Sequence, residues 1–339
     1  MKFFKDIQIN DNTIEFTTTH NTNVSIVNAI RRELMSGIEV YALHKDNAIV
    51  HINDSLFYTE FLITNRIPMI PINYEIVKNK KLQFYLCNQD NINEPLINNT
   101  NSVMHVTLQY FKIMDEKTEY KPDEIFVYPN MEVCWLRPNQ KLHLMYDGLK
   151  QGNGYEHAMY QNFRINKYTF NPEKENESIK EQQDYEKTSY GDPASIKMEM
   201  ESLGKINPKT AIMLVLNNII NKINNFMQEI NDIGSKTNIT MIDDKYAEVI
   251  VVDETYTLCN ILKYYCIKTI DSMSNNTNNP ANYFNIACNE KHPLKKEFIL
   301  KIQTYDTLDI SGKIEFTNII NEACNNAIED ISNIMEEFD

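Results

Sequence analysis

Two adjacent arginines, Arg31 and Arg32, are the residues of this sequence whose type and spacing best suit a chemical task. On a helix, neighbouring side chains point about 100° apart, so one local acid cannot pair with both. A guanidinium binds a carboxylate through two parallel hydrogen bonds, and arginine is enriched at protein interfaces. Two interpretations stay open on this evidence: a solvated helix face, or a contact with a partner chain.

Metal-ligating residue types are present but scattered. The six cysteines form no C-x-x-C pair, and the seven histidines do not cluster along the chain. Cys87 and Cys134 stand alone in their region, whereas a structural zinc needs three or four ligands at workable spacing. Cys259 and Cys266 lie seven apart on one expected helix. We therefore expect reduced, mostly buried thiols, no metal and no cofactor.

Catalytic signatures are also missing. The sequence contains no G-x-S-x-G, no aspartate cluster of the polymerase or nuclease type, and no phosphate-binding loop among its eight glycines. Asp243 and Asp244 are expected in a turn. His157 lies in a glycine-containing loop, where a lone histidine is usually structural or interfacial. An enzyme with a site around Glu156 and His157 is a rival that no residue positively supports, so we expect no catalytic residue.

Composition narrows the function classes. The 339-residue chain has a net charge of −14 and a pI near 5.0, which argues against nucleic-acid binding through its own basic surface. It can still belong to a complex whose other chains hold the nucleic acid. No apolar run approaches the ~20 residues of a membrane helix. The charged start, Met1 to Asp6, does not resemble a signal peptide.

Hydrophobic periodicity predicts an alternation of strands and helices. In the first half we expect strands within 1–20 and 38–52, a helix over 23–36, and a β-rich region from about 53 to 155. Asn23 or Ser25 can cap that helix, and Gly37 suits its end. In the second half we expect, in order, the charged exposed loop 171–193, a helix over 207–231, a strand over 246–252, a helix over 255–271, a strand over 298–304 and a helix over 313–338.

The order of these elements repeats, and the two short helices align. The segment from Ser25 to Arg31 matches the segment from Thr257 to Lys263 in hydroxyl, aliphatic, asparagine and cation positions. Each half ends in a long helix whose apolar stripe is too broad for a small sheet to cover. We therefore predict an α+β fold in which two units form an intramolecular pseudo-dimer. The expected interface residues are Leu258, Leu262, Ile219, Ile223, Ile320 and Ile331.

The same argument gives domain boundaries. The first dimerisation unit is expected to be discontinuous, formed by residues 1–50 and 156–231. A β-rich insert domain occupies 51–155, and the second unit occupies 239–339. A polar break at 232–238 separates the two units.

Several motifs resemble the alpha-type subunits of cellular RNA polymerases, a group that comprises the bacterial alpha subunit, its archaeal D-type counterpart and the third-largest subunit of eukaryotic polymerase II. The first-unit matches, in order, are Asn28-Ala-Ile-Arg-Arg-Glu-Leu34, Asn53-Asp-Ser55, Glu60-Phe61, Arg66-Ile-Pro-Met-Ile-Pro-Ile72, Gly152-Asn-Gly-Tyr-Glu-His-Ala158 and Met198 to Gly204. The cysteine-rich zinc loop that eukaryotic relatives often carry is missing from the insert.

The second half is similar to the small partner of the same heterodimer, which is the L-type polypeptide in archaea and the eleventh subunit in eukaryotes. The matching segments are Asp253 to Leu262, His292-Pro-Leu294 and Ile302-Gln-Thr304. Cys259 stands where the family usually has glycine. One chain with both units resembles the fused subunit of large DNA viruses that encode their own polymerase.

This resemblance implies a non-catalytic assembly subunit of a virus-encoded DNA-directed RNA polymerase. It implies docking of the two largest subunits, with small polymerase subunits nearby, and DNA and RNA reached only through the complex. Nucleotidyl transfer would belong to the largest subunit. The implied partner contacts are Asn28, Arg31 and Arg32, followed by Arg66, Pro68 and His157.

A cytoplasmic viral factory and the virion are the expected locations, because no nuclear-type basic cluster is evident. The alternative is a free-standing homodimeric scaffold or adaptor outside transcription. Such a protein would purify alone rather than with very large chains.

Overall fold

The computed structural model describes residues 2–20, 23–115, 118–170, 185–188, 191–232, 237–243, 246–276, 284–290, 296–304 and 312–338. Most of the expected loop 171–193, most of the break at 232–238, Asp244 and the His292-Pro-Leu294 segment lie outside the described residues. Helices and strands are mixed throughout, as expected for an α+β fold.

The first sheet has four antiparallel strands in the order β1-β2-β14-β13. Helix α1 follows its first hairpin, and helix α6 follows its last strand. The elements of this part are β1 (Phe4–Ile9), β2 (Thr13–Thr18), α1 (Val24–Arg32), β13 (Phe163–Thr169), β14 (Lys197–Ser202) and α6 (Pro208–Asn231).

The second sheet repeats this plan. Its four antiparallel strands have the order β15-β16-β18-β17, with α7 after the first hairpin and α8 after the last strand. Its elements are β15 (Asn238–Asp243), β16 (Tyr246–Val252), α7 (Tyr256–Asn276), β17 (Phe284–Glu290), β18 (Glu297–Thr304) and α8 (Gly312–Phe338). Both parts therefore share the sequence strand, strand, helix, strand, strand, helix, and the same strand order.

The segment between α1 and β13 carries three further sheets and a second core. Six strands form the sheet β4-β11-β5-β8-β9 with β6 beside β11, and two pairs, β10-β7 and β12-β3, flank it. The strands are β3 (Val40–Ala42), β4 (Ala48–Asn53), β5 (Gln83–Leu86), β6 (Leu96–Ile97), β7 (Met104–Thr107), β8 (Phe111–Asp115), β9 (Thr118–Tyr120), β10 (Glu132–Leu136), β11 (Lys141–Asp147) and β12 (Lys150–Gly152). Short helical turns connect them: α2 (Thr59–Phe61), α3 (Tyr74–Val77), α4 (Pro122–Ile125) and six 3-10 or π turns.

Local sequence explains where the main helices begin and end. The Asn23 side chain accepts a hydrogen bond from the Ile26 amide (2.9 Å) and caps α1, and Asn207 caps α6 with Pro208 in its first turn. After Arg32 the chain continues as a π turn to Gly37. A side chain at Gly37 would overlap the Glu33 carboxylate, so a glycine is required there.

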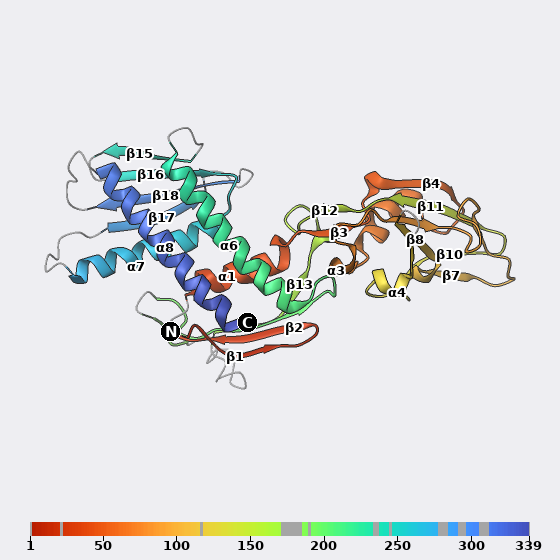
Figure 1. Ribbon diagram of the computed structural model, residues 1–339, viewed down its shortest axis with the longest axis horizontal. Helices are drawn as coiled ribbons and strands as arrows, with labels where there is room; N and C mark the ends of the chain where they lie inside the picture. Colours follow the sequence, from red (N-terminus) through yellow and green to blue (C-terminus); the bar gives the residue numbers. More distant parts are fainter. Residues whose placement is uncertain are drawn as a thin grey trace.

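The two long helices cross from one sheet to the other. Figure 1 shows α6 and α8 side by side, with the second sheet at one end of the molecule and the β4-β11 sheet at the other. Helix α6 contacts β2 and also β15, and α8 contacts β15 and also β1. Each long helix therefore packs on its own sheet and on the other one.

The C-terminal turn of α8 shows this crossing in detail. The Phe338 ring lies 5.4 Å from Phe4 and 5.6 Å from Phe16, centroid to centroid. The Glu337 carboxylate accepts hydrogen bonds from the Phe3 and Phe4 amides at 2.6 and 2.8 Å. Since the chain ends lie together here (Figure 1), the last turn holds the first strand in place.

The structure corrects several sequence predictions. Strands β15 and β17 were not expected, and α7 extends to Asn276 rather than 271. Cys259 and Cys288 pair as a disulfide between α7 and β17, with their Cα atoms 6.2 Å apart, so the expectation of six reduced thiols is wrong for this pair. The other four cysteines are free and buried, as expected. None of the described helices is long and apolar enough to cross a membrane.

We expect Phe338→Ala to lower the free energy of unfolding by roughly 3 kcal/mol, because it removes a ring buried against two others. Urea denaturation followed by circular dichroism measures the change. Tyr58→Ala is the matched control, since that side chain is 86% exposed and its loss should cost less than about 0.5 kcal/mol. Equal losses in the two variants would contradict the packing described.

Candidate protein-docking site

A pocket of about 370 Å³ lies between one face of α1, along its whole length, and the first turn of α7. Both aligned segments contribute to it: Ser25 and Thr257 line it together, and so do Asn28 and Asn260. Positions that match in the sequence alignment thus face the same space. The remaining lining residues are Val24, Arg31, Arg32, Asp192 and Tyr256.

The two arginines sit at the end of α1, on the rim of this pocket. Arg31 is half-buried, and its Nε donates to Asn28 Oδ1 (3.3 Å), which also accepts from the Tyr168 hydroxyl (3.4 Å). Arg32 is exposed and hydrogen bonds to Tyr155. Within the described residues, neither guanidinium has a carboxylate oxygen within 4.0 Å.

The opposite wall carries one acid. Burial raises the pKa of Asp192, and the nearby Lys263 ammonium opposes this shift. Lys263 is the residue that aligns with Arg31, so the cation of the second half has an acid of this chain nearby. Among the residues that the structure describes, the pocket lining thus carries two arginines from α1 and one acid, Asp192.

A partly buried ion pair between α1 and α6 holds the arginine end of α1. The buried Glu33 carboxylate accepts a hydrogen bond from Lys222 Nζ of α6 (2.6 Å) and one from the Tyr155 hydroxyl (3.4 Å). Burial, aided by Glu33, raises the pKa of Tyr155 to about 12, so its hydroxyl remains a donor. These bonds fix the end of α1 against α6.

The glycine-containing segment 152–158 packs on the same helix end. A side chain at Gly154 would come within 2.7 Å of the Ser36 backbone, so only glycine permits this approach. His157 is exposed, and its Nδ1 accepts a hydrogen bond from the Met159 amide (3.2 Å). In this segment Tyr155 lies next to Arg32 and Glu33, whereas His157 lies on the surface.

Arg66 and Pro68 lie elsewhere, in the β-rich part. Arg66 donates to the carbonyls of Val133 (2.7 Å) and Glu132 (2.9 Å), and its guanidinium lies 5.2 Å from the Phe57 ring centroid. Pro68 is buried in a 3-10 turn. The structure therefore does not bring these two residues together with the arginine pair, and it gives both of them contacts within this chain.

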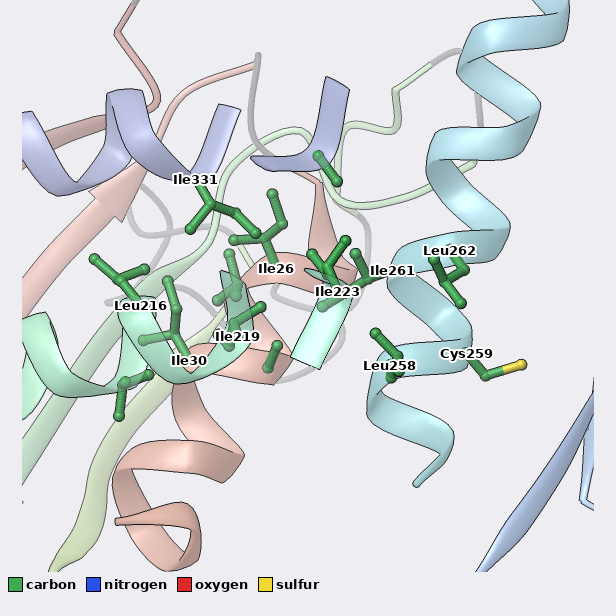
Figure 2. Packing of buried hydrophobic residues seen from close by; sticks show 14 of the residues in the cluster. Ile26, Ile30, Leu216, Ile219, Ile223, Leu258, Cys259, Ile261, Leu262 and Ile331 are labelled. Atoms are coloured by element: carbon green, nitrogen blue, oxygen red, sulfur yellow. The ribbon is translucent and has the colours of Figure 1, made fainter. Parts of the chain in front are cut away.

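The expected interface residues all lie in one core. Leu258, Leu262, Ile219, Ile223, Ile320 and Ile331 are at most 3% exposed and belong to a single hydrophobic cluster. Figure 2 shows side chains of α1, α6, α7 and α8 meeting, with Ile261 pointing towards Ile223 and Ile26, and Cys259 pointing away from them. Ile26 and Ile261 were not singled out from the sequence, although their aliphatic type and spacing on α1 and α7 carry the signal.

Six of the nine lining residues were not predicted from the sequence as site residues: Val24, Ser25, Asp192, Tyr256, Thr257 and Asn260. Tyr256 and Asp192 line the pocket because the fold brings together segments that are far apart in the chain. No local sequence pattern predicts this. Asn260 could have been found, because it aligns with Asn28. Within the described residues, no three histidine, cysteine or acidic side chains gather as a metal site.

The pKa of Glu254, in the turn before α7, generates a pH prediction. Burial raises this pKa, the carboxylates of Glu33 and Glu229 add to the shift, and Lys222 opposes it. A raised acid pKa favours folding below the ordinary value of 4.5, and this gain is lost as the pH rises through the folded-state pKa. We expect Glu254→Gln to be more stable than the parent at pH 7 and equal to it below pH 4.5 in urea titrations.

Glu201→Gln provides the control of opposite sign. The Arg164 guanidinium lowers the pKa of exposed Glu201, so its charge stabilises the folded state above the ordinary pKa and ceases to do so in acid. We expect Glu201→Gln to be less stable than the parent at pH 7, and we expect the difference in unfolding free energy to vanish as the pH falls. A Glu254→Gln variant that is less stable than the parent at pH 7 would refute the burial argument.

The comparisons with known proteins agree with the geometry. The family model of the RNA polymerase Rpb3/Rpb11 dimerisation domain matches residues 18–223, from β2 to the middle of α6. No match was found among curated proteins. The match covers more than half of the chain and confirms the resemblance to alpha-type polymerase subunits. The chain therefore belongs to the RNA polymerase Rpb3/Rpb11 dimerisation-domain family.

Proposed function

We propose that this chain is the non-catalytic assembly platform of a virus-encoded, multisubunit DNA-directed RNA polymerase, and that it docks the two largest subunits. Family membership makes it an assembly-type polymerase subunit that partners with other subunits. The observation that carries the finer proposal is the repeated connectivity of its two halves, whose long helices each reach both sheets.

The repeat supports an intramolecular pseudo-dimer. A dimerisation domain normally needs a second chain, but here the second partner follows in the same chain. Helix α8 packs on β1 of the first sheet, just as α6 packs on β15 of the second sheet. Helix α1 packs on α7. All four helices contribute to one hydrophobic cluster that runs through both halves (Figure 2). The pairing thus has the continuous core of an obligate interface.

The same contacts support the domain division. We assign residues 1–50 and 156–231 to the first dimerisation unit, 51–155 to the insert domain and 239–339 to the second unit. A separate hydrophobic cluster holds the insert together; it runs from Leu43 to Tyr146 and so begins a few residues before the assigned boundary. Buried Lys205 links insert and first unit: its Nζ donates to the Met159 carbonyl, and its own carbonyl accepts from the Tyr74 amide (2.7 Å).

Docking is assigned to the end of α1. Asn28, Arg31 and Arg32 form a rigid group at the pocket, held by the Glu33–Lys222 pair and carrying charge that this chain does not neutralise within the described residues. Exposed His157 extends the same surface. Arg66 and Pro68 would affect partner binding indirectly, by stabilising the insert. Arg66 does so by donating hydrogen bonds to two carbonyls of β10.

The remaining chemistry belongs to partner chains. With a net charge of −14, this chain would reach DNA and RNA only through the assembled complex. Nucleotidyl transfer would take place in the largest subunit. The fused arrangement and the abundance of asparagine and isoleucine, whose codons are A/T-rich, suit a large DNA virus. We accordingly place the chain in the cytoplasmic viral factory and in the virion.

The double variant Arg31→Glu with Arg32→Glu tests the docking proposal. We expect an unchanged urea midpoint and a loss of about a hundredfold in affinity for the second-largest polymerase subunit of the same genome, because reversed charges repel its docking surface. Co-expression followed by pull-down and mass spectrometry measures the loss.

Arg137→Glu is the matched control, since this exposed arginine lies in the insert, away from the pocket. It should leave capture unchanged. Normal recovery of the complex from the double variant would contradict the proposal. A parent chain that captures no large subunit and purifies as a homodimer would favour a free-standing scaffold instead.

A further inference from the structure

The docking pocket is a composite of both units. Helix α1 of the first unit contributes Ser25, Asn28 and the arginine pair, and the start of α7 contributes Tyr256, Thr257 and Asn260. Neither unit alone would enclose this space. Any ligand that fills the pocket therefore contacts residues 25–32 and 256–260 at once, which are more than two hundred positions apart in the sequence.

The lining groups define the chemistry of an occupant. Arg31 and Arg32 offer guanidinium donors, and Asn28 and Asn260 each offer an amide that can both donate and accept. The Thr257 hydroxyl is buried and has no hydrogen-bond partner among the described residues. These donors favour an occupant rich in acceptor oxygens.

The α1 and α7 sides of the pocket carry matching serine, threonine and asparagine positions, but their charges differ. Two arginines of α1 line the pocket and have no ion pair among the described residues, and Asp192 lines it as well, with the Lys263 ammonium near enough to oppose the rise of its pKa. A carboxylate therefore fits beside the two arginines. Paired asparagines at repeated positions suit the alternating amide and carbonyl groups of an extended peptide.

We propose that this pocket receives an extended segment of a large polymerase subunit, with an aspartate or glutamate side chain on the arginine pair and its backbone between Asn28 and Asn260. This inference rests on the proposed function and adds the chemistry of the docked segment and the contribution of the second unit to its site.

The sign of the occupant's charge is tested at Asn260, on the α7 side. Asn260→Asp keeps the size of the side chain and adds a negative charge to the pocket, and Asn260→Ala removes the amide without adding charge. For the second-largest subunit of the same genome, we expect Asn260→Ala to weaken capture about tenfold and Asn260→Asp to weaken it further. The urea midpoint of each variant checks that the fold is intact.

The outcomes separate this inference from the proposed function. If Arg31→Glu abolishes capture while both Asn260 variants bind like the parent, docking uses the first unit alone and the composite pocket is refuted, although the polymerase role stands. If Asn260→Asp strengthens capture, the occupant is basic and the inference is overturned. If the parent captures neither large subunit, the proposed function fails, and the inference fails with it.

Cross-linking identifies the occupant directly. Tyr256 lies on the pocket wall and is 38% exposed, so its replacement by p-benzoylphenylalanine places a photoreactive ring at the site. We expect irradiation of the complex to join this position to a peptide of a large subunit that contains an aspartate or glutamate within a few residues. A cross-linked peptide without an acid, or with only lysine and arginine, would overturn the inference.

Discussion

The burial of two long helices against two sheets at once is the constraint on which the rest of this structure depends. A four-stranded sheet covers only part of a helix of 24 or 27 residues, so α6 and α8 each leave apolar surface beyond their own sheet. That surface is buried because each helix continues over the other sheet and the two helices pack together. One hydrophobic cluster, from Phe3 to Phe338, is the result, and it makes the two halves a single folding unit.

This shared core also fixes the position of the charged groups. Packing α1 against α7 brings their first turns to one pocket and places Glu33 beside Lys222 of α6. The buried pair adds no obvious stability, because desolvation offsets much of its attraction, but it admits few other arrangements of the helix end. The arginine pair is thus held on a rigid support. Its position is a consequence of the same packing that forms the fold.

The sequence predicted the elements with strong periodicity and the repeat that relates them. The long helices and the cap at Asn23 follow from local patterns that the structure retains, and the residues predicted for the interface are buried in one cluster. Strand β15 was missed because Asn238-Ile-Thr-Met-Ile-Asp243 begins and ends in turn-forming residues. The pairing of Cys259 with Cys288 was missed because strand β17 was missed, and spacing alone does not reveal which cysteines meet. The internal contacts of Arg66 and the pocket walls at Asp192 and Tyr256 depend on tertiary placement, which no local pattern encodes.

Cleavage of the chain between its two units tests the central claim most directly. A protease site inserted within 232–237 would separate the two units without touching either sheet. The account predicts that the cut fragments elute together on gel filtration without denaturant and separate only in urea, because the apolar core holds them. Elution of two separate folded fragments in buffer would show that the halves do not form one core, and it would contradict the account.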